Sequence, residues 1–166
     1  DMNSSVPFSR GFIMTGLALI ALPLAEAKIE RVVEKSFAIT DAGTVRIETS
    51  GGQIQVTPSA DATVVRVVAT QRFDVSTESE ADEVAKSSTV TIEQDGNDVT
   101  AKAEHHNKGG GSSWFGIFRN NDRKRVRVDF AVTVPAAFAV VAKTSGGDLE
   151  IGNIAGPVKA TTSGGH

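Results

Sequence analysis

The clearest regularity in this chain is an alternation of apolar and polar residues that leads three times into the tetrapeptide Thr-Ser-Gly-Gly. The three copies occupy residues 49–52, 144–147 and 162–165. Apolar residues stand two and four positions before each threonine, and the alternation resumes on the same spacing after the first two copies. A period of two is typical of strands with one buried face. Self-similarity of this kind is typical of stacked structural units.

The spacing of the copies predicts a β-solenoid. Thr144 and Thr162 are 18 residues apart, which is close to one coil of short strands and tight corners. Glycine pairs suit such corners because glycine tolerates a positive φ. The alternative is an ordinary β-sandwich in which a hairpin-turn sequence recurs by chance. The residues expected at the structural turns are Thr49, Gly51, Gly52, Thr144, Gly146, Gly147, Thr162, Gly164 and Gly165.

The rest of the pattern predicts a β-rich hairpin region with one short helix ahead of the later repeats. Alternation predicts strands over residues 44–56, 63–73 and 126–134, and a hairpin over residues 89–103 that turns at 95–98. Residues 78–88 are rich in Glu, Ala and Lys and favour a short surface helix.

A flexible inserted loop is expected at about residues 105–125, where the alternation stops. It contains a glycine-rich stretch, then bulky aromatic residues, then cations. Aromatic rings beside cations can stack on a sugar or contact an anionic polymer. The alternatives are a loop whose aromatic side chains cap an open end of the β-structure, and simple disorder. The candidate ligand-contact residues are Trp114, Phe115, Phe118 and Arg119.

The N-terminal residues predict export. Arg10 is followed by an uncharged, mostly apolar stretch over residues 11–24, and Ala25 and Ala27 form a small-x-small cleavage site. The apolar stretch has 14 residues, fewer than the roughly 20 that span a bilayer as a helix. We therefore expect a signal peptide at 1–27 and no stable membrane span after its cleavage, with an uncleaved anchor as the alternative. The expected location is secreted, in the periplasm or at the cell surface.

The expected mature unit is one β-strand-repeat domain over residues 28–166. The third Thr-Ser-Gly-Gly copy is followed only by His166, whereas the earlier copies continue into another strand. We therefore expect the domain to be incomplete, truncated at its C-terminus.

Composition narrows the functional classes. The chain has no cysteine, which excludes a structural disulfide and a thiol nucleophile. With 17 basic and 20 acidic residues its formal net charge is −3, which argues against general nucleic-acid binding.

The candidate chemical groups predict neither a catalytic site nor a metal or cofactor site. His105 and His106 are adjacent, so on a strand they point to opposite faces and do not easily share one ion. Asp148 and Glu150 share a face, but the first repeat has glutamines at the equivalent places, which indicates ordinary outward polar residues. The serines of the repeats lack the flanking pattern of a nucleophile elbow.

The order of several short motifs resembles the bacterial putative-adhesin family of β-strand-repeat proteins. They are Val-Arg-Ile-Glu-Thr-Ser-Gly-Gly-Gln-Ile-Gln-Val, the helical Glu-Ala-Asp-Glu-Val-Ala, Gln-Asp-Gly-Asn-Asp-Val, Val-Thr-Val-Pro-Ala-Ala and Lys-Thr-Ser-Gly-Gly-Asp-Leu-Glu-Ile. The likeness covers about Val45 to the end. It implies a right-handed parallel β-solenoid preceded by a β-rich region, in an envelope or surface protein without known catalysis. The aromatic insertion at 109–118 departs from the family pattern.

Together these features predict an exported, non-enzymatic β-repeat protein of the bacterial cell envelope. We expect it to be an adhesin-like interaction module whose partner is an envelope polymer or another protein. There are two alternatives. The first is a sensor or regulatory domain of an envelope-stress pathway, and the second is a carbohydrate-active enzyme.

Overall fold

The computed structural model describes residues 28–61, 63–106 and 126–165. The expected signal peptide and residues 107–125 of the expected loop lie outside this part of the chain. The strands are β1 (Ile29–Ala38), β2 (Thr44–Thr49), β3 (Ile54–Ser59), β4 (Val64–Phe73), β5 (Ser88–Asp95), β6 (Asp98–His105), β7 (Val126–Pro135), β8 (Ala139–Thr144), β9 (Leu149–Ile151) and β10 (Val158–Thr162), and the helix is α1 (Glu78–Ala85).

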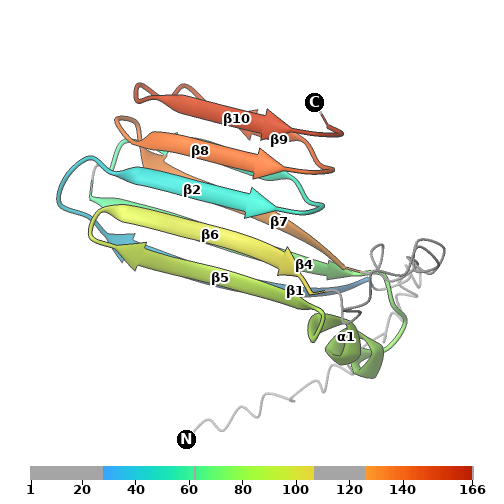
Figure 1. The fold of residues 1–166 in the computed structure, drawn as a ribbon. Coiled ribbons are helices and arrows are strands. Elements are labelled where there is room, and N and C mark those ends of the chain that lie inside the picture. The colour runs from blue at the N-terminus through green and yellow to red at the C-terminus, as the bar shows by residue number, and fades with distance from the viewer. Residues whose placement is uncertain (1–27, 62, 107–125, 166) are drawn as a thin grey trace, which may run out of the picture.

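The strands form two five-stranded sheets that face each other (Figure 1). The first sheet, sheet A, has the order β1-β4-β7-β3-β9, and the second, sheet B, has the order β10-β8-β2-β6-β5. Both sheets are mixed. In sheet A, β3 is parallel to β7 and β9, whereas β4 is antiparallel to both β7 and β1. In sheet B, β10, β8, β2 and β6 are parallel, and β5 is antiparallel to β6.

The expected right-handed parallel β-solenoid is therefore wrong, although the fold is β-rich with one short helix. The repeat that predicted it covers only the segments around β2–β3, β8–β9 and β10. The long strand β4, which carries no repeat, pairs antiparallel with β7 over eight residue pairs. The β5–β6 hairpin ends sheet B with a second antiparallel pair. A local repeat thus builds the parallel parts of two mixed sheets.

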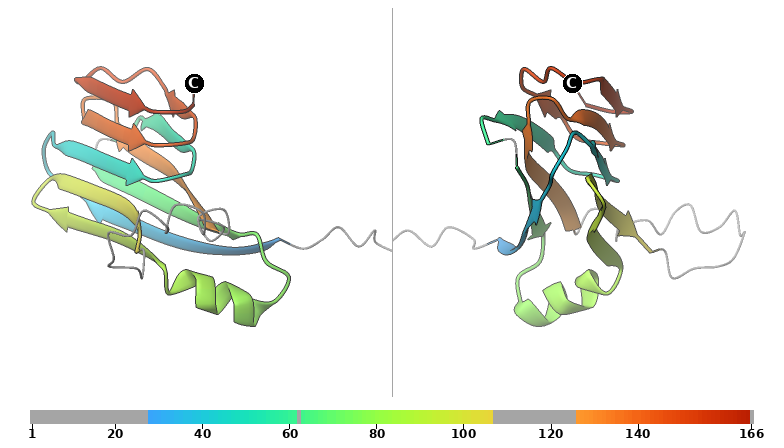
Figure 2. Two further views of the ribbon diagram at one scale, coloured as in Figure 1. Left: turned by 45° about the vertical axis from the view of Figure 1, so that its right-hand side comes forward. Right: turned by 90° about the vertical axis from the view of Figure 1, so that its left-hand side faces the viewer.

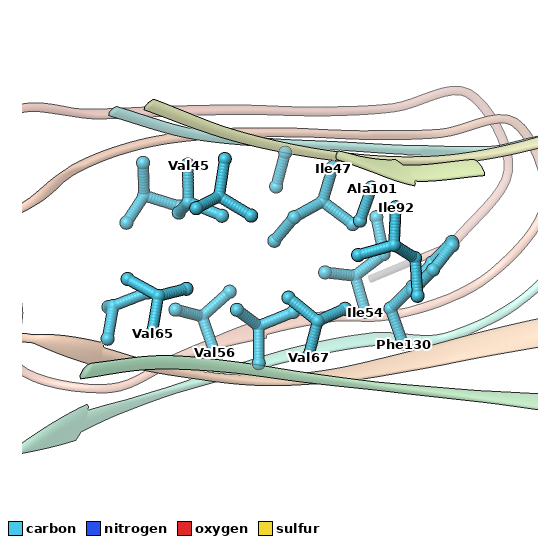
Figure 3. Close-up of a cluster of buried hydrophobic side chains, with 14 of the residues drawn as sticks. Val45, Ile47, Ile54, Val56, Val65, Val67, Ile92, Ala101 and Phe130 are labelled. Atoms are coloured by element: carbon cyan, nitrogen blue, oxygen red, sulfur yellow. The ribbon is translucent and has the colours of Figure 1, made fainter. Parts of the chain in front are cut away.

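The apolar side chains that alternate along the strands meet between the two sheets and form the main core. Val45 and Ile47 of sheet B and Ile54 and Val67 of sheet A are each fully shielded from solvent. Figure 3 shows the side chains of the two sheets pointing toward one another. This arrangement explains the period of two, because each strand buries one face and exposes the other.

Helix α1 lies beside one end of the two sheets (Figure 2). Its start follows from a capping box, in which the Thr77 side chain accepts from the Glu80 amide and the Glu80 side chain accepts from the Thr77 amide. Arg31 of β1 holds the helix through ion pairs with Glu78 at 3.1 Å and Asp82 at 2.6 Å. Its guanidinium also lies 5.2 Å from the centre of the Phe73 ring.

Several predicted elements are confirmed, with shifted bounds. The hairpin of β5 and β6 turns at Gly96 and Asn97, as its sequence indicates, and the predicted helix is present but ends at Ala85. The predicted strand over 44–56 is two strands, β2 and β3, that belong to different sheets. In the part of the chain that the structure describes, no helix combines the length and the hydrophobicity needed to cross a bilayer.

Candidate functional site

The three Thr-Ser-Gly-Gly segments lie in register at one end of sheet B. Thr49 of β2 is the register partner of Thr144 of β8, and Thr144 is the partner of Thr162 of β10. The strands run parallel, so the three turns lie one above another (Figure 1). Residues that are far apart in sequence therefore form one short column at the edge of the molecule.

Each threonine hydroxyl in this column donates to a backbone carbonyl of the neighbouring layer. Thr144 Oγ1 lies 3.0 Å from the Gly52 carbonyl oxygen, and Thr162 Oγ1 lies 3.2 Å from that of Gly147. At the base of the column Thr49 Oγ1 donates to the Val128 carbonyl of β7 at 3.0 Å. Since Thr49 and Thr144 are buried, these hydroxyls satisfy backbone acceptors that water cannot reach.

The second glycine of each copy is required for close approach between layers. A Cβ at Gly147 would lie 2.0 Å from the Gly52 carbonyl oxygen, and one at Gly165 would lie 2.0 Å from that of Gly147. Gly52 meets the Val128 carbonyl in the same way, at 1.8 Å. The first glycines are different, because a Cβ at Gly51 or at Gly146 would meet no atom within 4 Å.

The predicted reason for these glycines is therefore wrong. Among the described residues a positive φ occurs only at Gly96, in the β5–β6 turn, where φ is 60°. The repeat glycines do not have a positive φ, so contact with the neighbouring layer, and not a left-handed conformation, selects glycine at Gly52, Gly147 and Gly165.

The outer face of sheet B carries a group of three exposed cations, which we call the basic face: Arg46, Lys143 and Lys159. Arg46 of β2 and Lys159 of β10 are both register partners of Val141 of β8. Two strand spacings separate them, which is about 10 Å. Lys143 lies two residues further along β8, on the same face. In the part of the chain that the structure describes, none of the three forms an ion pair.

Several cations elsewhere on the described surface are neutralised by neighbouring carboxylates. On sheet A, Arg66 pairs with Glu34 at 2.7 Å, and the hydrogen bond from Arg66 holds the pKa of Glu34 below its ordinary value. Arg72 pairs with Glu30 and Asp129. On sheet B, Lys102 pairs with Glu104 at 2.7 Å, and this contact raises the pKa of Lys102. The basic face thus differs from these sites in leaving its positive charge available to a partner.

One carboxylate lies within the basic face. Glu48 of β2 is the register partner of Lys143 on one side and of Lys102 on the other. The local charge of Arg46, Lys143, Lys159 and Glu48 is nevertheless positive, although the whole chain has a formal net charge of −3. This face is not evident from the sequence, because the three cations come together only when β2, β8 and β10 align.

The candidate ligand-contact residues Trp114, Phe115, Phe118 and Arg119 lie outside the described residues, so this prediction stays a prediction. The structure does describe the strands on either side of this segment. His105 ends β6, and Val126 begins β7 in the facing sheet. The imidazole of His106 lies 2.8 Å from the Thr89 hydroxyl.

The two carboxylates considered for catalysis, Asp148 and Glu150, are both exposed. Glu150 accepts a hydrogen bond from the Gln55 side chain at 3.3 Å, across strands β9 and β3 on the exposed face. No group of three or more His, Asp or Glu side chains in the described part of the chain is arranged to hold a metal ion.

No protein-family model matches the chain, and no curated protein matches it. Three solved structures show partial likeness. One is a "putative cell adhesion protein" from Clostridium sporogenes, with 12% identity over 73% of this chain and 50% of that one, at a TM-score of 0.33. Another is a "putative adhesin" from Bacteroides fragilis, with 12% identity over 80% of this chain and 53% of that one, at a TM-score of 0.32.

The third structure is a "putative lipid binding protein" from Parabacteroides distasonis. It shares 13% identity over 78% of this chain and 51% of its own, at a TM-score of 0.34. The chain therefore spans about half the length of each of these structures.

Proposed function

We propose that this protein is an exported, non-enzymatic interaction module of the bacterial cell envelope, adhesin-like, and that it binds an acidic partner through the basic face. The signal-like sequence of residues 1–27 supports the export. Arg46, Lys143 and Lys159, which form no ion pair within the described residues, carry the proposal for binding, because surface charge that is not neutralised by neighbouring groups is available to a ligand.

The strands hold this face in a fixed arrangement. Val140 and Ala142, which flank Val141 on β8, are buried in the core, so the backbone beneath the basic face is packed on its inner side. Charged groups at fixed separations favour a partner with repeating negative charges, such as an acidic polysaccharide of the envelope. Preorganisation of this kind lowers the entropic cost of binding.

A charge-reversal experiment tests the proposal. Purified protein is titrated with an acidic envelope polysaccharide at low and at physiological ionic strength. Lys143→Glu should weaken binding about three- to tenfold, and combining it with Arg46→Glu and Lys159→Glu should abolish binding, because surface electrostatic attraction is replaced by repulsion.

Arg127→Glu is the matched control. Arg127 is an exposed residue of β7 in sheet A, and its reversal changes the net charge by the same amount. Equal weakening by Arg127→Glu and Lys143→Glu would show a response to net charge alone and would contradict a binding role for the basic face. The aromatic segment is tested separately, since deletion of residues 109–121 should reduce binding only if that segment also contacts the ligand.

A further inference from the structure

Two rows of register partners cross the outer face of sheet B at right angles to its strands. Successive members of a row lie on neighbouring strands, about 4.8 Å apart. The first row consists of Lys159 of β10, Val141 of β8, Arg46 of β2, Thr100 of β6 and Glu93 of β5. The second row is displaced by two residues along each strand and consists, in the same strand order, of Thr161, Lys143, Glu48, Lys102 and Thr91.

The second row is close to neutral. Its cations, Lys143 and Lys102, lie two strand spacings apart, and the residue between them is Glu48. Lys102 is also paired with Glu104 at 2.7 Å. The pKa of Lys102 is raised by the hydrogen bond with Glu104 and, to a smaller extent, by the charge of Glu48. The carboxylates of this part of the face therefore offset its positive charge.

The first row has the same spacing of cations but a different residue between them. Lys159 and Arg46 are both exposed, and the side chain between them belongs to Val141, which is half-buried. The carboxylate of this row, Glu93, lies two strands beyond Arg46. The first row thus presents two positive charges about 10 Å apart across an apolar position.

This spacing distinguishes two kinds of acidic polymer. In an extended peptide, side chains on one side recur every second residue, about 6.7 Å apart. The carboxylates of an acidic peptide therefore do not match Lys159 and Arg46. In an extended β-linked polysaccharide, each sugar advances the chain by about the distance between two neighbouring strands. A carboxylate carried on every second sugar therefore recurs at about the separation of the two cations.

The other members of the first row suit the sugar that lies between two acidic ones. Val141 offers an apolar surface to the C–H face of a neutral ring and carries no charge to oppose a carboxylate. On the other side of Arg46, the exposed hydroxyl of Thr100 is available to sugar hydroxyls. Glu93 would repel a further carboxylate, so it limits the row on the side of β5.

We propose that the acidic partner of the basic face is a linear β-linked polysaccharide with a carboxylate on every second sugar, which lies across the strands along the first row. One carboxylate contacts Lys159, the next contacts Arg46, and the neutral sugar between them packs on Val141. Lys143 lies beside the row and adds attraction without setting the spacing. This inference rests on the proposed function of the basic face and adds the direction and the period of the ligand.

The central test is an exchange variant, Arg46→Val with Val141→Arg. It has the composition and net charge of the original protein, but its two cations lie on neighbouring strands. The probe is hyaluronan octasaccharide, in which glucuronate alternates with neutral N-acetylglucosamine, and its affinity is measured by calorimetric titration at low ionic strength. The exchange variant should bind about tenfold more weakly, because the carboxylates of the probe no longer match both cations.

A second variant tests the position between the cations. Val141→Glu should abolish binding, because it places a carboxylate between Lys159 and Arg46, as Glu48 lies between the cations of the second row. Val68→Glu is the matched control, since Val68 is a half-buried valine on the outer face of sheet A. It changes the net charge by the same amount and should leave binding within about twofold of the original. Thermal unfolding checks that each variant is folded.

A peptide of alternating glutamate and threonine, with the same number of carboxylates as the octasaccharide, tests the class of polymer. It should bind more weakly than the octasaccharide and should not respond to the exchange of Arg46 and Val141. Tighter binding of the peptide would overturn the proposal and assign the basic face to an acidic polypeptide.

Two further results would overturn the proposal. One is equal affinity of the octasaccharide for the original protein and the exchange variant, and the other is equal loss of binding in Val141→Glu and Val68→Glu. If charge reversal at Lys143 weakens binding but the exchange does not, the basic face stands as a binding surface and the direction and period are wrong. If the protein binds no acidic polymer, both proposals fail.

Discussion

At the scale of single residues, the two glycines of each repeat copy have different roles. Gly147 faces a backbone carbonyl that cannot move without disturbing the next strand, whereas Gly146 faces open space. The sequence alone does not distinguish the two positions, because both are glycine in all three copies. The distinction comes from which side of the turn meets the neighbouring layer.

Gly147→Ala should therefore lower the free energy of unfolding by about 1–3 kcal/mol, the usual range for forcing an extra carbon into a packed region. Gly146→Ala should leave it unchanged or raise it by about 0.4–1 kcal/mol, because alanine restricts the unfolded chain. Urea denaturation of the two variants measures both effects. Equal destabilisation would contradict the different roles of the two positions.

The threonine column predicts a second residue-level effect. Thr144→Val keeps the shape of the side chain but removes the hydroxyl that donates to Gly52, leaving a buried carbonyl unsatisfied. The free energy of unfolding should fall by about 1–3 kcal/mol. Thr162→Val should cost less, because Thr162 is only partly buried. The same urea measurement applies, and a larger loss for Thr162→Val would contradict the assignment of Thr144 as the more buried donor.

At the scale of elements, the turn between β3 and β4 is held by Asp61. Its carboxylate accepts from the Thr63 hydroxyl at 2.6 Å and from the Thr63 amide at 2.9 Å. These hydrogen bonds hold the pKa of Asp61 below its ordinary value, with the hydroxyl as the larger cause.

A lowered pKa in the folded state adds stability that is present above the unfolded-state pKa, about 3.9. This stability is lost as the pH falls through the lower, folded-state value. Replacing Thr63 by alanine should move the pKa of Asp61 back toward the unfolded value, since it removes the hydroxyl donor. Carboxyl titration by NMR measures this. An unchanged pKa in Thr63→Ala would contradict the assigned cause.

The sequence predicted elements where the pattern is local. The β5–β6 hairpin was predictable because its turn residues and flanking alternation are contiguous, and α1 because one contiguous segment is rich in the helix-favouring residues Glu, Ala and Lys. Strand β1 was missed, because its adjacent valines, Val32 and Val33, interrupt the alternation at an edge where both are exposed. The pairing of β4 with β7 was not predictable either, since nothing in a single strand specifies the direction of a distant partner.

The basic face was not predictable from the sequence for a related reason. Arg46 lies about a hundred residues before Lys143 and Lys159 in the sequence, and each stands among ordinary outward polar positions. Only the parallel register of β2, β8 and β10 brings them onto one face. Repeat recognition predicted that the turns are related, but not that the strands around them continue into mixed sheets.

At the scale of the whole molecule, the fold combines a region of parallel strands at one end with a region of antiparallel strand pairs at the other. Strands β2, β8 and β10 repeat one layer, and β1, β4 and β5 add antiparallel pairs at the other end. One apolar core runs between the two sheets and includes residues of both regions. The two ends of the molecule therefore differ, since one is next to α1 and the other presents β9 and β10.

The register of the repeat strands is the claim on which the basic face depends, and paired cysteines test it most directly, because the chain has no native cysteine to interfere. Glu48 and Lys143 are register partners on the exposed face, so their Cα atoms should lie about 5 Å apart, within disulfide range. Arg46 and Lys143 are displaced by two residues and should be about 8 Å apart, beyond that range. Under mild oxidation the Glu48→Cys, Lys143→Cys protein should form an intramolecular disulfide rapidly and the Arg46→Cys, Lys143→Cys protein should not. Equal rates, or faster closure of the second pair, would contradict the stacked register.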